Sequence, residues 1–104
     1  MNILKNNYDA IEKLIFDEAI RIEAIDIQTE FDTMLIILNT KAVLHQKISN
    51  YQKLKQATTF DLKNFVFTGN GIGIHWPTID EDLSLKGFLR DELLNIVKKN
   101  IQAA

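Results

Sequence analysis

The chain has 104 residues, a formal net charge of −2 at pH 7, 46% hydrophobic residues and 25% charged residues. This composition is typical of a globular protein, and the length predicts a single domain over residues 1–104. Without a basic surplus, the chain is not expected to bind nucleic acid or an anionic membrane. Because it has no cysteine, disulfides, thiol catalysis and cysteine-ligated zinc are excluded.

Apolar runs in the sequence are all too short for a signal-peptide core or a membrane span. Residues 1–5 lead directly into polar sequence. We therefore expect a cytoplasmic protein with no membrane partner.

The first helix is predicted over residues 7–19. Ile11, Leu14 and Ile15 lie on one apolar stripe, and Asn7 or Asp9 is placed to cap the helix start. Its polar face carries mixed charge, which disfavours a membrane role. The stripe is therefore expected to pack on a sheet.

Three strands follow. Residues 19–23 alternate between apolar and polar, and the apolar set changes parity over residues 24–27, which predicts a strand with a bulge or bend near Ala24. Residues 33–38 are apolar on both faces, as in a central strand covered by a helix on one side and by another element or a partner subunit on the other. Residues 42–48 return after a short turn, which completes an antiparallel meander.

Two short helical turns connect this meander to the second half of the chain. Ser49 is predicted to cap the first turn, in which Tyr51 and Leu54 are spaced to face inward. Thr58 and Asp61 stand at capping-box spacing at the start of the second turn.

A β-hairpin is predicted next. Residues 64–68 and 72–76 are short runs rich in β-branched and aromatic residues, and the Gly69-Asn70-Gly71 sequence between them suits a tight turn. Pro77 lacks the N–H that the ladder needs, so the second strand is expected to end there.

The two faces of the second hairpin strand differ. Because side chains alternate along a strand, Ile74 and Trp76 face the core, whereas Gly73 and His75 share the opposite face. That face is nearly bare backbone with an imidazole at its end. It admits close approach by another part of the fold, a partner chain or a ligand.

An acidic loop over residues 78–82 is predicted after the hairpin. It contains Asp80, Glu81 and Asp82, which lie just ahead of a predicted helix. Ser84 can accept from the free N–H groups of that helix, so the acidic triplet has a simple structural explanation as a helix start.

The last helix is predicted after Ser84, with Leu89, Leu93, Ile96 and Val97 on one apolar stripe. Acidic residues fall early in it and lysines fall late, an order that suits the helix dipole. The fold class is therefore α+β. We expect a small antiparallel sheet, made of a three-stranded meander plus a β-hairpin, with an N-terminal and a C-terminal helix packed on it.

A specific motif runs through the second half of the chain. Its residues are Tyr51, Leu54, Ala57, Thr58, Gly69, Gly71, Gly73, Ile74, His75, Trp76, Pro77, Asp80, Glu81, Asp82, Leu83, Ser84, Gly87, Phe88 and Leu89. The pattern resembles the bacterial family catalogued as domain of unknown function 2442, in the branch that reads roughly G-x-G-x-G-I-H-W-P-x-x-D-E-D-I-S. The chain departs from the family at Gln52, where a proline is frequent, and at Asn39-Thr40-Lys41, where an Asp-Gly turn is frequent.

The resemblance implies a small α+β fold with a short antiparallel sheet. It implies a family-like core over residues 20–89, a helical addition over residues 1–19 and a C-terminal helix over residues 90–104. Family members are mostly uncharacterised, and some are encoded beside a small companion protein and are suspected to be antitoxins.

The first functional hypothesis is a non-enzymatic protein-interaction module, antitoxin-like in that it binds a small companion protein. No catalytic residue, metal ligand or cofactor is assigned. The candidate binding residues, on the acidic loop and the glycine-rich strand, are Gly73, His75, Trp76, Asp80, Glu81 and Asp82.

Two alternatives remain open. A small enzyme could use His75 as a general base oriented by Asp80, Glu81 or Asp82, or could use all four as ligands of a divalent metal. A paired histidine is, however, also common in purely structural networks. In the other alternative the motif only shapes the fold, and the chain forms a homo-oligomer through residues 33–38 or through the added helices.

Overall fold

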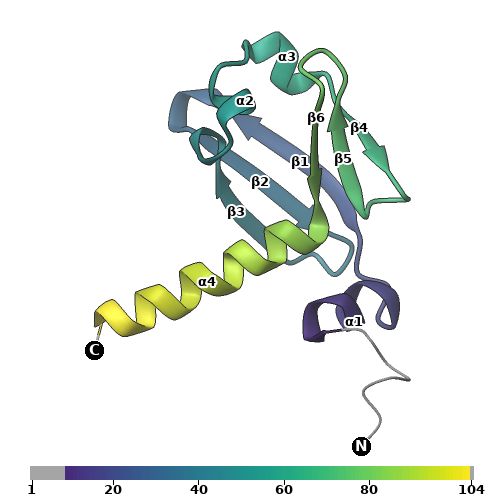
Figure 1. Cartoon of the computed structure of the whole chain (residues 1–104), viewed down its shortest axis with the longest axis vertical. Helices are drawn as coiled ribbons and strands as arrows, with labels where there is room; N and C mark the ends of the chain where they lie inside the picture. The colour runs from purple at the N-terminus through teal and green to yellow at the C-terminus, as the bar shows by residue number, and fades with distance from the viewer. Residues whose placement is uncertain (1–8, 104) are drawn as a thin grey trace, which may run out of the picture.

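The computed structural model describes the backbone of residues 9–103 and the side chains of residues 9–98. Within these residues the chain forms two three-stranded antiparallel sheets and four α-helices (Figure 1). The elements in chain order are α1 (Ala10–Phe16), β1 (Ile22–Gln28), the 3-10 turn η1 (Thr29–Phe31), β2 (Thr33–Leu38), β3 (Val43–Lys47), the 3-10 turn η2 (Ile48–Asn50), α2 (Gln52–Lys55), α3 (Thr59–Lys63), β4 (Val66–Thr68), β5 (Gly73–Trp76), β6 (Glu81–Ser84) and α4 (Leu85–Ala103). The predicted α+β class is confirmed.

Helix α1 is capped by Asp9, one of the two predicted caps. The Asp9 carboxylate accepts from the Glu12 backbone N–H at 2.8 Å, and the Glu12 carboxylate accepts from the Asp9 N–H at 3.1 Å, which completes a capping box. The helix ends at Phe16, before the predicted residue 19, and Ala19 adopts a left-handed φ of 57° that cannot continue a helix. Asn7 and the predicted helix start lie outside the described residues.

The first sheet has the strand order β1-β2-β3, which is the predicted meander. Its β1–β2 register shifts between Ile22 and Ala24, so the predicted bulge is confirmed. Along the central strand β2, Met34 and Ile36 are buried while Leu35 is partly exposed. One face of β2 therefore lies in the core, and the described chain covers the other face only in part.

The second sheet has the strand order β4-β5-β6 and contains the predicted hairpin as β4 and β5. The prediction of a loop through residue 82 was wrong, because Glu81 and Asp82 belong to β6, which pairs with the free edge of β5. The residues of β6 are mostly polar and do not by themselves predict a strand, so its extended conformation depends on backbone pairing with β5. The hairpin is thus part of a three-stranded sheet.

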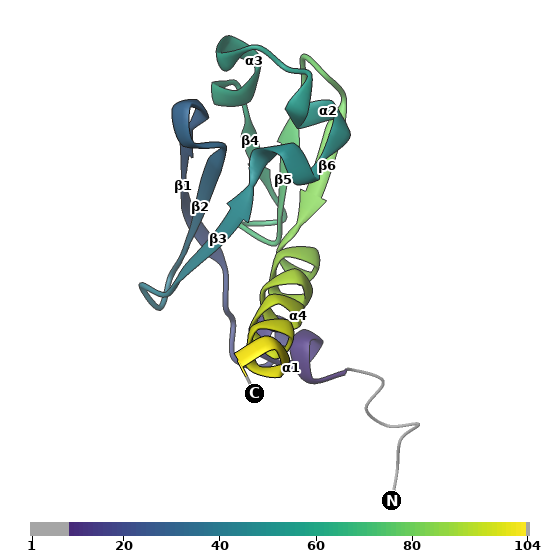
Figure 2. The same ribbon diagram turned by 90° about the vertical axis from the view of Figure 1, so that its left-hand side faces the viewer.

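A single buried cluster joins the two sheets, which Figure 2 shows as separate layers. Trp76 is fully buried in this cluster, and its indole N–H donates to the Leu62 carbonyl at 2.9 Å. At the edge of the cluster the Ile22 N–H donates to the Gly71 carbonyl at 2.9 Å. Gly71 has a φ of 96°, and a Cβ there would lie 2.6 Å from the Ile22 oxygen, so this junction requires glycine.

Helices α2 and α3 cover one end of the molecule. The prediction that Ser49 caps the following turn was wrong. Its backbone N–H donates to the Asp32 carboxylate at 2.8 Å, and α2 is preceded by Tyr51, which forms no side-chain cap. Thr58 and Asp61 form the predicted capping box at the start of α3.

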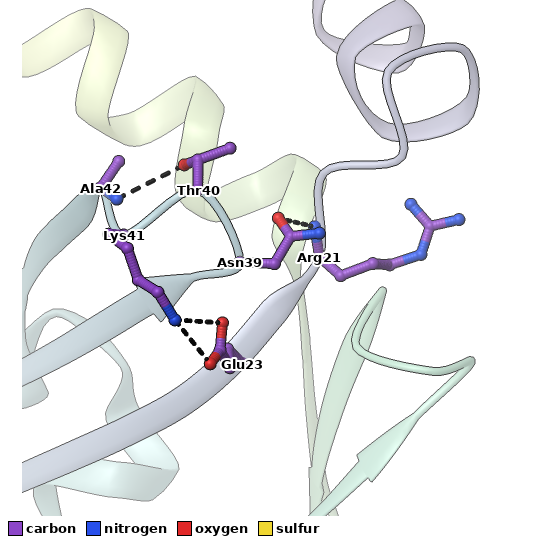
Figure 3. A network of polar contacts seen from close by, with 6 residues as sticks. All are labelled: Arg21, Glu23, Asn39, Thr40, Lys41 and Ala42. Atoms are coloured by element: carbon purple, nitrogen blue, oxygen red, sulfur yellow. Dashed lines mark hydrogen bonds and ion pairs between the residues drawn. The ribbon is translucent and has the colours of Figure 1, made fainter.

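The β2–β3 turn holds the segment between α1 and β1, as Figure 3 shows for the turn and the start of β1. The Asn39 side chain accepts from the Arg21 N–H at 3.1 Å and donates to the Ala19 carbonyl at 3.0 Å. Lys41 forms an ion pair with Glu23 at 2.9 Å. Helix α1 itself packs mainly on α4 among the described elements, and the Lys86 ammonium of α4 lies 3.2 Å from the Glu12 carboxylate of α1.

Candidate functional site

His75 and Asp82 face each other across β5 and β6 on the outer face of the second sheet. They are register partners, and the His75 Nδ1 lies 2.8 Å from the Asp82 Oδ1. The side chain of His75 is 29% exposed and that of Asp82 is 72% exposed. On the other side of His75, β4 presents the half-exposed Val66. The sequence-predicted histidine and one of the three predicted carboxylates are therefore brought together on a solvated surface.

The other two predicted carboxylates do not converge on His75. Glu81 lies one residue before Asp82 on β6, so its side chain leaves the opposite face of the strand. Asp80 has a left-handed φ of 51° in the turn before β6, and its carbonyl accepts from the Lys53 ammonium at 2.8 Å. In the part of the chain that the structure describes, no three histidine, cysteine or acidic side chains are grouped closely enough to hold a metal ion.

The turn between β5 and β6 is also held from α3. The Thr58 backbone N–H, followed by the hydroxyl of Thr78, keeps the pKa of the Asp61 carboxyl below its usual range. The acidic segment is thus attached to both short helices, at the end of the molecule where Figure 1 shows α3.

Trp76 and Gly73 support the site from within. Trp76 lies in the core, so it positions β5 and does not offer a surface to a partner. A Cβ at Gly73 would lie 2.6 Å from the Thr68 hydroxyl, so glycine lets β4 and β5 approach closely here. A depression of about 390 Å³ follows this strand face, and it is lined by Thr68, Gly69, Ile72, Gly73, Asp82, Leu83 and Ser84.

A second polar cluster, which the sequence analysis missed, lies where α4 passes β3. The Tyr51 hydroxyl lies 2.9 Å from the Gln46 Oε1 and 3.3 Å from the Asp91 carboxylate. Gln46 is buried, and its Nε2 finds no partner in the described chain. Burial, together with the negative charge of Asp91, raises the pKa of Tyr51. No local signal joins Asp91 to Tyr51, which lies 40 residues earlier in the sequence.

Helix α4 changes character along its length. It begins as predicted, with the Gly87 N–H donating to the Ser84 hydroxyl at 3.0 Å, and Leu85 and Phe88 are buried in its first turns. Beyond Glu92 every described residue of the helix is exposed. Figure 1 shows this second half extending away from both sheets.

The exposed half of α4 has an inverted distribution of polarity. Asp91, Asn95 and Lys98 line the depressions between α4 and the body of the protein. At about 100° per residue, these three positions fall on one side of the helix, and the predicted apolar positions fall on the opposite side. We call these apolar residues the α4 stripe; they are Leu93, Ile96 and Val97, with exposed fractions of 54%, 48% and 43%.

Two small antiparallel sheets and a projecting C-terminal helix place this chain in the class of small α+β proteins. It belongs to the family described as "Protein of unknown function (DUF2442)", which matches residues 22–92. The family expected from the sequence is confirmed. The match ends where the α4 stripe begins, and it does not include α1.

Two solved structures share the fold. A crystal structure of a protein of unknown function from Rhodospirillum rubrum is 25% identical, with a TM-score of 0.62 over 69% of this chain and 87% of that chain. A solution NMR structure of an uncharacterised protein from Chromobacterium violaceum is 24% identical, with a TM-score of 0.65 over 86% of this chain and 82% of that chain. No curated protein sequence matches this chain. Among its described residues, no helix is both long and apolar enough to cross a membrane.

Proposed function

We propose that this chain is a non-enzymatic cytoplasmic protein-interaction module and that the α4 stripe is its contact surface. The observation that carries the proposal is the inverted polarity of α4, whose aliphatic side chains point to solvent while its polar side chains face its own protein. Covering an apolar stripe of this kind with another surface is favourable, because it removes apolar area from water.

The length of the helix supports the same conclusion. The described part of α4 continues through Ala103, well past its last buried residue, Phe88. An isolated helical segment of this size is only marginally stable in water, because most helical stability comes from packing of an apolar face. A partner on the α4 stripe would supply that packing.

The outer face of the second sheet, with His75 and Asp82, is the second part of the proposed surface. An antitoxin-like role with a small companion protein is the narrower form of this proposal, and it rests on the family resemblance alone. The partner would then contact the α4 stripe, with or without the sheet face.

The His75–Asp82 pair is the one observation that favours the enzyme alternative, because a carboxylate orients the imidazole. The pair lies on a solvated strand face, where water competes with every proton transfer. His75 is also not among the residues that line the depression beside Asp82. We therefore rank the interaction role first.

Affinity capture from a native lysate tests the proposal. The baits are the wild-type chain, a stripe variant (Leu93→Lys with Val97→Lys), a matched control (Leu94→Lys) and a sheet-face variant (His75→Ala with Asp82→Ala), each shown by circular dichroism to be folded. Leu94 is 49% exposed but lines the polar side of α4. We expect a specific protein that the stripe variant loses and the control retains. Equal capture by all four baits, or no specific capture by any of them, would overturn the proposal.

A further inference from the structure

We propose that the hollow between β3 and α4 binds an extended acidic peptide segment of a partner protein, which pairs with the free edge of β3. We call this hollow the edge groove. Its volume is about 410 Å³, and it is lined by His45, Gln46, Lys47, Asn50 and Asn95. The edge groove lies on the opposite side of α4 from the stripe, so the inference goes beyond the proposed contact surface and does not depend on it.

Strand β3 leaves one row of backbone groups unpaired. It is an edge strand of the first sheet, with β2 on one side and α4 passing nearby (Figure 1). The Leu38 N–H donates to the Ala42 carbonyl at 2.9 Å, and hydrogen-bonded pairs then alternate along the regular β2–β3 register. The backbone N–H and C=O groups of Val43, His45 and Lys47 therefore point away from β2. Among the described residues, no backbone group pairs with them on that side.

This edge favours a peptide over a free anion. An anion accepts hydrogen bonds and can satisfy only the N–H groups, whereas the edge also presents carbonyl oxygens that need donors. An extended segment supplies both kinds of group at the same spacing, which is how peptides add to exposed sheet edges. Strand β3 is five residues long, a usual length for a paired strand.

The other three sheet edges are less suited to an acidic segment. The hairpin turn meets β1, where the Ile22 N–H donates to the Gly71 carbonyl. Strand β4 has only three residues. Strand β6 carries Glu81 and Asp82, which would repel a segment of the same charge. The open edge of β3 is therefore the one that we assign.

The groove is basic although the whole chain has a net charge of −2. Lys47 lines it, and Lys98 lines an adjoining hollow of about 300 Å³ that shares Asn50 and Asn95 with it. Among the described residues, neither lysine forms an ion pair. The one carboxylate that lines either hollow, Asp91, lies within hydrogen-bond distance of a tyrosine hydroxyl. Two lysines without carboxylate partners are complementary to an acidic segment.

The wall of the groove also holds a hydrogen-bond donor that lacks an acceptor. Gln46 is 2% exposed, and its Oε1 lies 2.9 Å from the Tyr51 hydroxyl. Its Nε2 has no partner in the described chain, which is unfavourable for a buried amide. A carboxylate or carbonyl oxygen of a bound segment can supply the missing acceptor. Occupation of the groove would therefore satisfy this side chain.

NMR spectroscopy of the full chain labelled with ¹⁵N tests the site. The probe is a capped peptide of about six residues in which glutamate alternates with threonine. The comparison peptide has lysine in place of glutamate. We expect the acidic peptide to shift the backbone amides of His45 and Lys47 in a saturable manner, and the basic peptide to leave them unchanged. No shift with the acidic peptide, or equal shifts with both, would overturn the proposal.

Charge reversal tests the role of the two lysines. Lys47→Glu with Lys98→Glu should raise the Kd of the acidic peptide by about 10-fold or more. The matched control, Lys55→Glu with Lys63→Glu, makes the same change in net charge at exposed positions on α2 and α3 and should change the Kd much less. Circular dichroism checks that both variants are folded. Equal weakening by the two variants would mean that the peptide responds only to net charge, and would overturn the proposal.

Two backbone-methylated peptides test the strand pairing. One carries N-methyl groups at every glutamate and the other at every threonine. Because alternate N–H groups of a strand point to opposite edges, only one of the two sets can donate to β3. We expect one methylated peptide to bind and the other to lose binding. Wild-type affinity for both, or equal shifts with free glutamate, would overturn pairing by an extended segment.

The same assay separates this inference from the proposed function. The stripe variant, Leu93→Lys with Val97→Lys, should bind the acidic peptide as the wild type does, because its substitutions lie on the other side of α4. If the peptide fails to bind the wild type while lysate capture still depends on the stripe, only the edge groove is overturned. If the peptide binds but no bait captures a protein through the stripe, the edge groove survives alone.

Discussion

The outer face of the second sheet and the α4 stripe are both exposed, but among the described residues the sheet face has hydrogen-bond partners whereas the stripe is uncovered. His75 pairs with Asp82 across two strands, and the neighbouring turn is held by Lys53. Leu93 is half exposed at the end of a helix whose polar side faces the protein. The comparison teaches that the conspicuous sequence motif pairs within the described chain, whereas the plainer helix leaves apolar side chains exposed, which is why we propose it as the contact surface.

The largest expected difference in stability is between substitution of Trp76, which is buried beneath the second sheet, and of Leu93 in the α4 stripe. Trp76→Ala should lower the free energy of unfolding by about 3–5 kcal/mol, because it empties a fully buried site and leaves the Leu62 carbonyl without its donor. Leu93→Ala, measured where the chain is monomeric, should change it by about 0.5 kcal/mol or less. Urea unfolding monitored by circular dichroism measures both. Similar losses in the two variants would mean that the stripe is packed within the monomer.

A smaller effect is expected where the hairpin turn meets β1. Gly71→Ala should cost about 2 kcal/mol, because the φ is positive and the added Cβ meets the Ile22 oxygen. Gly69→Ala is the matched control. Its φ is also positive, but the added Cβ would lie an ordinary 3.4 Å from the side chain of Ile72 and would not meet β1. We expect it to cost about 1 kcal/mol. Equal costs by thermal unfolding would show that the Gly71 junction does not bind the two sheets together.

The hydrogen bonds of the Tyr51 hydroxyl should contribute about 1 kcal/mol to stability. Tyr51→Phe removes the hydroxyl that lies between Gln46 and Asp91 and should destabilise the chain by this amount. Because the folded-state pKa of Tyr51 is raised, the wild-type contribution is complete below the ordinary tyrosine pKa of about 10 and is lost as the pH rises through the folded-state value. Unfolding of the two proteins between neutral and alkaline pH checks this. A constant difference across that range would contradict the assignment.

The smallest effect is expected at the sheet face itself. His75→Ala and Asp82→Asn should each lower the free energy of unfolding by about 1 kcal/mol or less, since exposed ion pairs contribute little. Their double-mutant cycle should give a coupling energy of similar size. A coupling of several kcal/mol would show that the pair is more than a solvated cross-strand contact and would return weight to the enzyme alternative.

The sequence predicts the elements that have local signals. Strong alternation marks the meander, glycines mark the hairpin turn, and Thr58 with Asp61 marks the start of α3. Strand β6 lacks such a signal, because only Leu83 among its residues is a large apolar residue and its pairing comes from the free edge of β5. Ser49 was assigned to a cap for a similar reason, since its bond to Asp32 joins distant segments.

The candidate site, like the fold, could be predicted from the sequence only in part. The sequence brought His75 and the acidic residues together as candidates, and the pairing of Asp82 in particular depends on the register of β6, which no local pattern encodes. The stripe of α4 was also visible in the sequence, but it was expected to face the sheet. The position of Asp91 and Asn95 against the body reveals that the α4 stripe points outward.

Hydrogen exchange of the backbone amides from Leu93 onward is the most direct test of the claim that the α4 stripe is a contact surface. An uncovered helix end should exchange rapidly, whereas a paired one should be protected. We predict that protection of these amides rises when native lysate is added to the wild type and to Leu94→Lys, but stays low in Leu93→Lys. Protection that is already high in the isolated chain, or that stays low in the presence of lysate, would contradict the account.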